Sequence, residues 1–326
     1  MSFGQRAWEA TETESDPMTT KEINFGQWWH GMTAGQQQAW AQKIHQGAGG
    51  GASALKAFDG VIRDELVVHV TFKDGTAVLV DRNGRVIPIS GMKGVVDAKR
   101  AYYLTQPEID YAARLARLQE FYGKDVKFMS AAEFEDRCKA ALARITGNQQ
   151  IANLPRGPHF PFALPQLQGD AGQLLNDTII PALARSYKAQ FSKPPFTNYR
   201  EGELAGQVTV IPGTRQERLV EAMAKGPVCG VYFPALQGFG IIADREMITH
   251  LPENLILSGM EVPAVVTAYP EITGRDGKTP VLDMAALQWQ SDGFSLGFRA
   301  YGDEAFFDRR GLYPCDRCSG GVSVLG

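Results

Sequence analysis

The sequence predicts an α+β protein. An N-terminal helix, a three-stranded antiparallel meander and two helices are followed by a second α/β-type domain. Residues 65–90 alternate apolar and polar side chains around Asp-Gly at 74–75 and Asn-Gly at 83–84, dipeptides that supply the positive φ angles of tight hairpins. Residues 206–244 suit a strand, a helix, a second strand and a turn into a third strand. This order predicts a mixed sheet that contains a β-α-β unit.

The composition is that of a globular protein able to bury a core, with 326 residues that are 44% hydrophobic and 21% charged. A net charge of -3 gives no indication of nucleic-acid binding. The sequence contains no apolar run of membrane-spanning length, and its N-terminus lacks the apolar core of a secretory signal. Four cysteines in this length do not predict a disulfide framework. We therefore expect a cytoplasmic protein without a membrane partner.

Changes in composition along the chain predict the domain organisation. Residues 1–20 are polar and acidic and indicate a mobile tail. Residues 21–147 hold the N-terminal α+β domain, and residues 170–326 hold the C-terminal mixed α/β domain. Between them, residues 148–169 contain four prolines and no periodicity, which predicts a proline-rich linker.

The first predicted helix covers residues 25–46 and carries Trp28, Trp29 and Trp40. Large aromatic side chains of this kind favour a partner-binding face, with packing in the core as the alternative. The following residues, 47–52, are rich in glycine and suit a flexible connector.

Two further helices follow the meander. The first begins at Pro107 and runs to Tyr122, with apolar side chains spaced three or four residues apart. The second runs to Thr146 and begins at Ser130, which forms a capping box with Glu133.

The C-terminal half gives several start and stop signals. A helical region restarts at Pro181, and a capping box of Thr214 with Glu217 predicts a helix that ends at Gly226. The remaining predictions are strands at 207–211, 228–233 and 239–243, a helix at 258–268, a hairpin of 280–290 with 294–300, and an irregular C-terminal segment from 302.

Cys315 and Cys318 form the most specific local pattern for chemistry. Two thiols separated by two residues suit either a zinc site or a redox disulfide. A zinc site needs four ligands, which would have to include residues distant in sequence, namely His159, His250 or Asp308. The alternative is two thiols in a C-terminal loop, and no cofactor is then expected.

Two other groups of residues are candidates for catalysis. Cys229 and His250 are the one thiol-imidazole pair that the sequence allows us to assemble, although a buried cysteine without a positive neighbour is inert. The charged residues of segment 303–310 suit acid-base chemistry if their carboxylates lie close together, and an exposed ion-pair surface otherwise.

These patterns favour a non-enzymatic protein that binds another macromolecule, as an adaptor, inhibitor or accessory factor. The alternative is an enzyme with a site between its domains, such as a cysteine-dependent hydrolase or transferase that uses Cys229. The sequence leaves the choice between these two classes open, and it predicts a protein partner in the first case.

Overall fold

A computed structural model describes residues 77–89, 91–96, 104–192, 196–273, 280–301, 304–315 and 318–326. The predicted tail, the predicted tryptophan helix and the first strand of the predicted meander lie outside these residues. At the predicted Asn-Gly turn, Gly84 has a φ of 79°, and Val80 and Val86 form a single antiparallel bridge across it. The described part of the meander therefore contains this turn and isolated bridges, without regular strands.

The structure is α+β, as the sequence predicts, and its largest sheet is mixed. Parallel pairs join β10 to β6 and β9 to β2, while the other neighbours are antiparallel. The strand order is β1 (Phe160–Leu164), β4 (Val228–Gln237), β10 (Cys318–Leu325), β6 (Val281–Asp283), β8 (Phe294–Tyr301), β9 (Glu304–Gly311) and β2 (Phe196–Asn198), and β5 (Leu255–Leu257) also pairs with β10.

The predicted β-α-β unit does not form. Strand β3 (Val208–Val210) pairs with β7 (Leu287–Trp289) in a separate two-stranded sheet, whereas β4 lies inside the large sheet. Strand β4 is buried along nearly its whole length, as its apolar sequence predicts. Strand β3 is short, and its central residue Thr209 is exposed. Because such a strand has little apolar surface of its own, its pairing depends on the strand beside it, β7, and not on the helix that follows it in the sequence.

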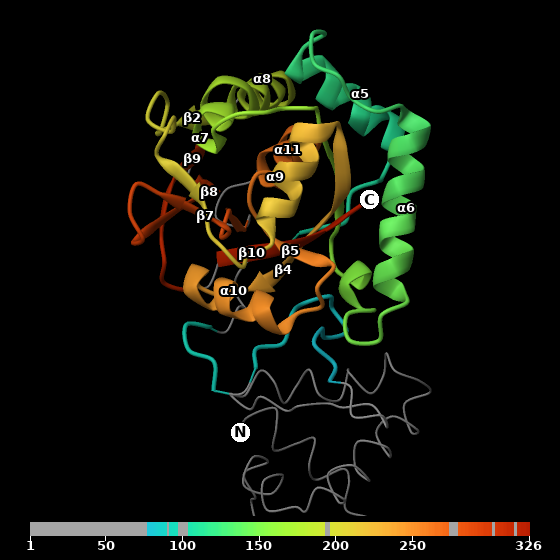
Figure 1. Cartoon of the computed structure of the whole chain (residues 1–326), viewed down its shortest axis with the longest axis vertical. Coiled ribbons are helices and arrows are strands. Elements are labelled where there is room, and N and C mark those ends of the chain that lie inside the picture. Colours follow the sequence, from blue (N-terminus) through green and yellow to red (C-terminus); the bar gives the residue numbers. More distant parts are fainter. Residues whose placement is uncertain are drawn as a thin grey trace, which may run out of the picture.

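Four helices pack together over β1 and β4: α5 (Tyr111–Tyr122), α6 (Ala131–Thr146), α8 (Ile180–Gln190) and α11 (Val262–Ala268). Figure 1 shows α5 and α8 at the top of the view and α6 at its right, beside the C-terminal end of the chain. The predicted cap of α6 is confirmed, because the Ser130 hydroxyl accepts a hydrogen bond from the Glu133 amide. Helix α5 begins later than predicted, since Asp110 caps it.

Helix α9 (Gln216–Lys225) has a different start from the predicted capping box. Thr214 donates its hydroxyl to the Ile211 carbonyl instead of accepting an amide, and Arg215 takes a left-handed conformation with a φ of 64°. Glu217 accepts the amide of Gly213 and so satisfies one donor ahead of the helix.

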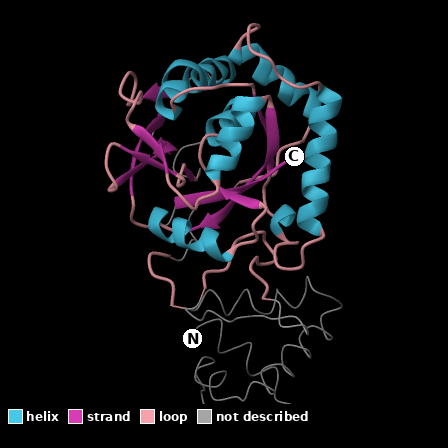
Figure 2. Cartoon of the chain, viewed as in Figure 1, coloured by secondary structure: helices cyan, strands magenta, loops and turns pink. Residues whose placement is uncertain are grey.

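Two C-terminal predictions are wrong. Residues 239–243 do not form a strand, because α10 (Ile241–Met247) begins there with buried side chains three or four positions apart. The segment from 302 is not irregular, since it supplies β9 and β10 to the large sheet, as the magenta arrows of Figure 2 show. The remaining short elements are α7 (Ala171–Leu174), a π-helical turn (Leu175–Ile179) and 3-10 turns at Leu154–Arg156, Ile248–His250 and Pro270–Ile272.

Residues 148–169, the predicted linker, contain a 3-10 turn and the whole of β1. All five residues of β1 are buried and paired with β4. One hydrophobic core combines side chains from both predicted domains with Phe160 and Phe162 of this segment. No helix in the described part of the chain is long and apolar enough to cross a membrane.

Candidate functional site at the Cys315–Cys318 disulfide

The start of β10 places a cysteine beside a buried carboxylate. Cys318 and Ser319 lie in parallel register with Val281 and Leu282 of β6, so the next residues along the two strands are Gly320 and Asp283. Side chains alternate along a strand, and Cys318 and Asp283 therefore face the same side of the sheet. Both residues are almost completely buried, with exposed fractions of 1% and 0%.

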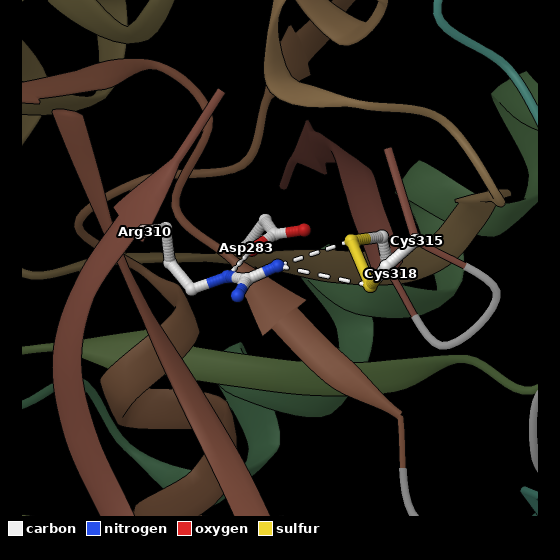
Figure 3. The surroundings of a disulfide bond; sticks show 4 residues. All are labelled: Asp283, Arg310, Cys315 and Cys318. Carbon is white, nitrogen blue, oxygen red and sulfur yellow. Dashed lines mark hydrogen bonds and ion pairs between the residues drawn. A yellow bond between two sulfur atoms is a disulfide. The ribbon is translucent and has the colours of Figure 1, made fainter. Parts of the chain in front are cut away.

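Arg310 of β9 reaches across this face. Its stem passes over Gly297 of β8, where an added Cβ would lie 2.9 Å from Arg310 Cγ, so the glycine leaves room for the aliphatic stem. Arg310 Nε donates to Asp283 Oδ1 at 2.7 Å, and Nη2 lies 3.0 Å from Cys318 Sγ and 3.9 Å from Cys315 Sγ. Figure 3 shows the guanidinium between the carboxylate and the two sulfurs.

Cys315 and Cys318 are joined by a disulfide, with their Cα atoms 5.1 Å apart. Cys315 is partly exposed, whereas Cys318 is buried against Arg310. A nearby guanidinium favours the thiolate over the thiol, and a thiolate is the form of cysteine that attacks and leaves in exchange reactions. The site therefore combines one sulfur that solvent can reach with one buried sulfur beside a fixed positive charge.

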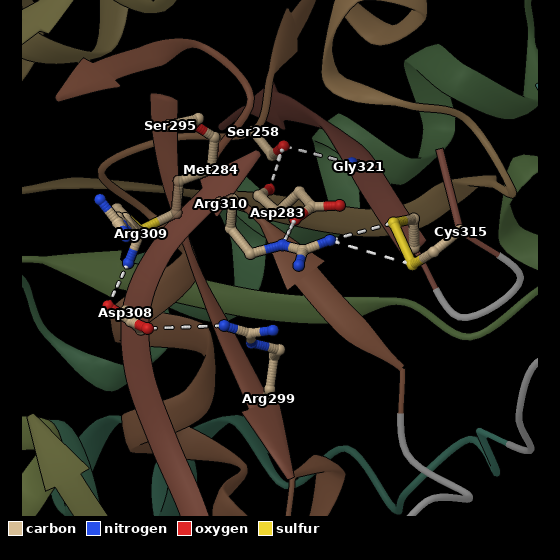
Figure 4. Close-up of polar contacts among 11 residues, drawn as sticks. Ser258, Asp283, Met284, Ser295, Arg299, Asp308, Arg309, Arg310, Cys315 and Gly321 are labelled. Atoms are coloured by element: carbon tan, nitrogen blue, oxygen red, sulfur yellow. Dashed lines mark hydrogen bonds and ion pairs between the residues drawn. A yellow bond between two sulfur atoms is a disulfide. The ribbon is translucent and has the colours of Figure 1, made fainter. Parts of the chain in front are cut away.

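Burial raises the pKa of the Asp283 carboxyl, and Arg310 opposes this rise through its charge and its hydrogen bond. The carbonyl of Asp283 accepts a hydrogen bond from Ser258 Oγ at 2.7 Å, and that hydroxyl also accepts the Gly321 amide at 3.2 Å. Figure 4 shows how these contacts tie β6 to β10. The position of Asp283 is thus fixed by its backbone as well as by Arg310.

The charged residues of segment 303–310 divide into two sets. Asp308 lies 2.9 Å from Arg200 and 3.5 Å from Arg299, in ion pairs at partly exposed positions. Arg310 is on the same face of β9 but turns inward to Asp283, as Figure 4 also shows. The carboxylate of Asp308 therefore has cations as its neighbours and no second carboxylate in the described contacts, which does not suit paired acid-base chemistry.

A second carboxyl group lies near Asp283. Asp244, in the first turn of α10, is completely buried, and neither of its carboxyl oxygens has a hydrogen-bond partner among the described residues. Burial raises the pKa of Asp244 well above its ordinary value, Asp283 raises it further, and Arg245 acts in the opposite direction. A buried carboxyl without partners is stable only in its protonated form.

The structure does not bring Cys229 into contact with His250. Cys229 is buried in β4 and shares a hydrogen bond with Cys138 of α6, which together with burial raises the pKa of Cys138. His250 is exposed in the 3-10 turn after α10, and no described contact joins it to Cys229. The hydrogen bond from Cys138 lowers the pKa of Cys229 while burial raises it, but no base contacts the Cys229 sulfur among the described residues, as an activated nucleophile would require.

The remaining candidates from the sequence are the possible zinc ligands, His159 and the three tryptophans. The described residues contain no group of three or more side chains arranged to hold a metal ion, and in the disulfide each sulfur is bonded to the other. His159 packs against Phe233, and burial lowers its pKa. Trp28, Trp29 and Trp40 lie outside the described residues, so a partner-binding role for them stays a prediction.

The two buried acids, Asp244 and Asp283, were not predicted from the sequence. Asp283 stands alone in the otherwise apolar run 280–287, and Asp244 closes the apolar run 239–243. A single carboxylate inside an apolar run is the signal that could have identified them, because charged residues are seldom fully buried unless they are paired or protonated.

Comparisons with protein-family models, with curated proteins and with solved structures found no match to this chain.

Proposed function

We propose that this protein is a thiol-disulfide redox protein whose reactive bond joins Cys315 and Cys318. The observation that supports this proposal is the position of Arg310, which Asp283 holds against both sulfurs. A guanidinium adds nothing to a disulfide that stays closed, but it stabilises the thiolate that appears when the bond opens.

In this proposal each cysteine has a different role. An external dithiol, as its thiolate, attacks the partly exposed Cys315 sulfur, and the electron pair of the broken S–S bond moves to Cys318 beside Arg310. The second thiol of the external molecule then attacks that molecule's first sulfur, which is bonded to Cys315 in the mixed disulfide. This step releases Cys315 and leaves the external molecule as a disulfide. The reverse sequence oxidises an external dithiol.

The first test compares the two single-cysteine variants of the site. In Cys318→Ser, Cys315 remains partly exposed, so iodoacetamide should label it at least about tenfold faster than it labels Cys318 in Cys315→Ser. Labelling is followed by mass spectrometry on the folded full-length chain, with the core thiols Cys138 and Cys229 as internal references.

The wild-type protein provides the decisive control. Dithiothreitol should open the Cys315–Cys318 bond while the circular dichroism of the protein stays native. Opening that occurs only when the protein unfolds would make the disulfide structural and would refute the redox proposal.

A second proposal is that the protein binds another macromolecule through an apolar surface. Among the described residues, four large hydrophobic side chains are exposed, and three of them lie in or next to segment 238–242 or in segments that contact it: Val96 at 37%, Ile242 at 54% and Tyr313 at 83%. Segment 312–314 packs on Gly240, where an added Cβ would lie 2.6 Å from Pro314 N, and the Val96 amide donates to Gly238. Exposed apolar side chains on segments that contact one another favour a contact surface.

This second proposal predicts loss of partner binding without loss of stability. Ile242→Ser with Tyr313→Ser should weaken capture of a partner from a host lysate at least about tenfold, because central apolar side chains dominate interfaces. The matched control is Tyr199→Ser, which removes the fourth exposed hydrophobic residue at a distant strand end. Equal capture by the two variants would dismiss this surface.

A further inference from the structure

The partly exposed sulfur of the disulfide lies at the end of an apolar surface segment. Residues 312–315 have the sequence Leu-Tyr-Pro-Cys, and none of them is buried. Tyr313 is 83% exposed and stands two residues before Cys315, so the Cα atoms of these two residues are at most about 7 Å apart. A molecule that attacks Cys315 therefore arrives within reach of a tyrosine side chain.

A second exposed apolar side chain belongs to a segment that contacts this one. Pro314, between Tyr313 and Cys315, packs on Gly240, where an added Cβ would lie 2.6 Å from Pro314 N. Gly240 is the N-cap of α10, and Ile242, which is 54% exposed, lies in the first turn of that helix. The close contact at the glycine thus joins the two segments that carry Ile242 and Tyr313.

The backbone next to Cys315 is available to pair with a peptide. The N–H and C=O of Tyr313 and the C=O of Pro314 make no hydrogen bond to any residue that the structure describes, whereas the Cys315 carbonyl accepts the Cys318 amide at 3.1 Å. An extended polypeptide can bond to such unpaired donors and acceptors. A small apolar thiol could contact the apolar side chains, but it lacks the matching row of backbone groups.

The charge at the site does not suit a small charged thiol. Arg310 is the cation beside the two sulfurs, but it is only 9% exposed, and Asp283 holds it at 2.7 Å. The guanidinium is therefore not offered to the carboxylates of a small thiol such as glutathione. Segment 312–315 offers an incoming thiol apolar side chains and backbone groups instead.

We propose that the dithiol that reacts with this disulfide belongs to an extended polypeptide, in which an apolar side chain adjoins the attacking cysteine. This inference rests on the proposed redox function. The apolar side chain packs on Tyr313 and Ile242 while the neighbouring thiolate bonds to the Cys315 sulfur, and the S–S electron pair goes to Cys318. The second thiol of the polypeptide then displaces Cys315, so the polypeptide becomes a disulfide and two electrons pass to this protein. Of the two thiol protons, Cys315 takes one and solvent takes the other, while Cys318 stays a thiolate beside Arg310.

The test measures how fast two synthetic dithiol peptides open the disulfide of the oxidised full-length protein. The peptides contain the same two cysteines and differ only in the residue before the first one, which is phenylalanine or serine. Each second-order rate constant is divided by that of the same peptide with oxidised glutathione, which removes differences in thiol reactivity. The phenylalanine peptide should be at least about tenfold faster, because its ring is removed from water when it docks.

Two tyrosine variants locate the surface that gives this preference. In Tyr313→Ser the preference should fall at least about threefold, whereas Tyr199→Ser, which removes an exposed tyrosine at a distant strand end, should keep it. An unchanged preference in Tyr313→Ser would overturn the proposed surface. The comparison of the two peptides in the wild type decides the question even if Tyr313→Ser does not fold.

Two results in the wild type would overturn the substrate class. One is equal corrected rates for the two peptides. The other is dihydrolipoamide, a small apolar dithiol, reacting as fast as the phenylalanine peptide after the same correction. Both results leave the redox function in place if dithiothreitol opens the native disulfide. A disulfide that dithiothreitol cannot open in the native wild type is a different result, and it would refute the redox function itself.

Discussion

Arg310→Met should lower the free energy of unfolding by about 3–5 kcal/mol, because it leaves the buried Asp283 carboxylate without its cation. The ion pair has exposed side-chain fractions of 10% for Arg310 and 0% for Asp283, so water cannot replace the lost partner. The measurement is urea unfolding of the oxidised protein near neutral pH, followed by circular dichroism.

The neighbouring arginine provides the control for this prediction. Arg309→Met removes an exposed guanidinium that lies 4.7 Å from the centre of the Phe294 ring, and it should cost no more than about 1 kcal/mol. The double variant Arg310→Met with Asp283→Leu should recover most of the lost stability, since it removes both charges together. Equal effects of the two single variants would mean that Arg310 and Asp283 do not form a buried pair.

Phe160→Ala should also cost about 3–5 kcal/mol, although Phe160 lies in the segment that the sequence predicts to be a linker. Its ring is completely buried, with ring centres 6.5 Å from Tyr232 and 5.4 Å from Tyr269. Truncation would leave a cavity between β1, β4 and α11, which the packed core cannot easily fill. Thermal and urea unfolding of the full chain measure the loss.

Gln168→Ala is the control for Phe160→Ala, because Gln168 is exposed and lies in the same segment. It should change the free energy of unfolding by less than about 0.5 kcal/mol. A single unfolding transition that shifts as a whole in Phe160→Ala would indicate that both predicted domains unfold together. Equal stability of the two variants would support the linker interpretation of residues 148–169.

The sequence by itself was sufficient for features that depend on neighbouring residues. The Ser130 cap of α6 and the buried strand β4 could be predicted because caps and apolar runs act within a few residues. The spacing of Cys315 and Cys318 left a zinc site, a redox disulfide and two loop thiols open, and the structure joins the two sulfurs in a disulfide. The predicted start of α9 was wrong, because the Thr214 hydroxyl can bond either to an amide of the helix or to the carbonyl of Ile211, and it bonds to the carbonyl.

The tertiary structure decided everything that depends on residues distant in the chain. Strand β3 could pair with any exposed edge, and the position of β7 settled its partner. In the sequence, Arg310 cannot be distinguished from a surface arginine. Its partner Asp283 lies 27 positions away in the sequence, and strand β6 brings the two side chains together. Burial and charge pairing are properties of the assembled sheet, so a local pattern can identify the cysteines but not the acid and the arginine that surround them.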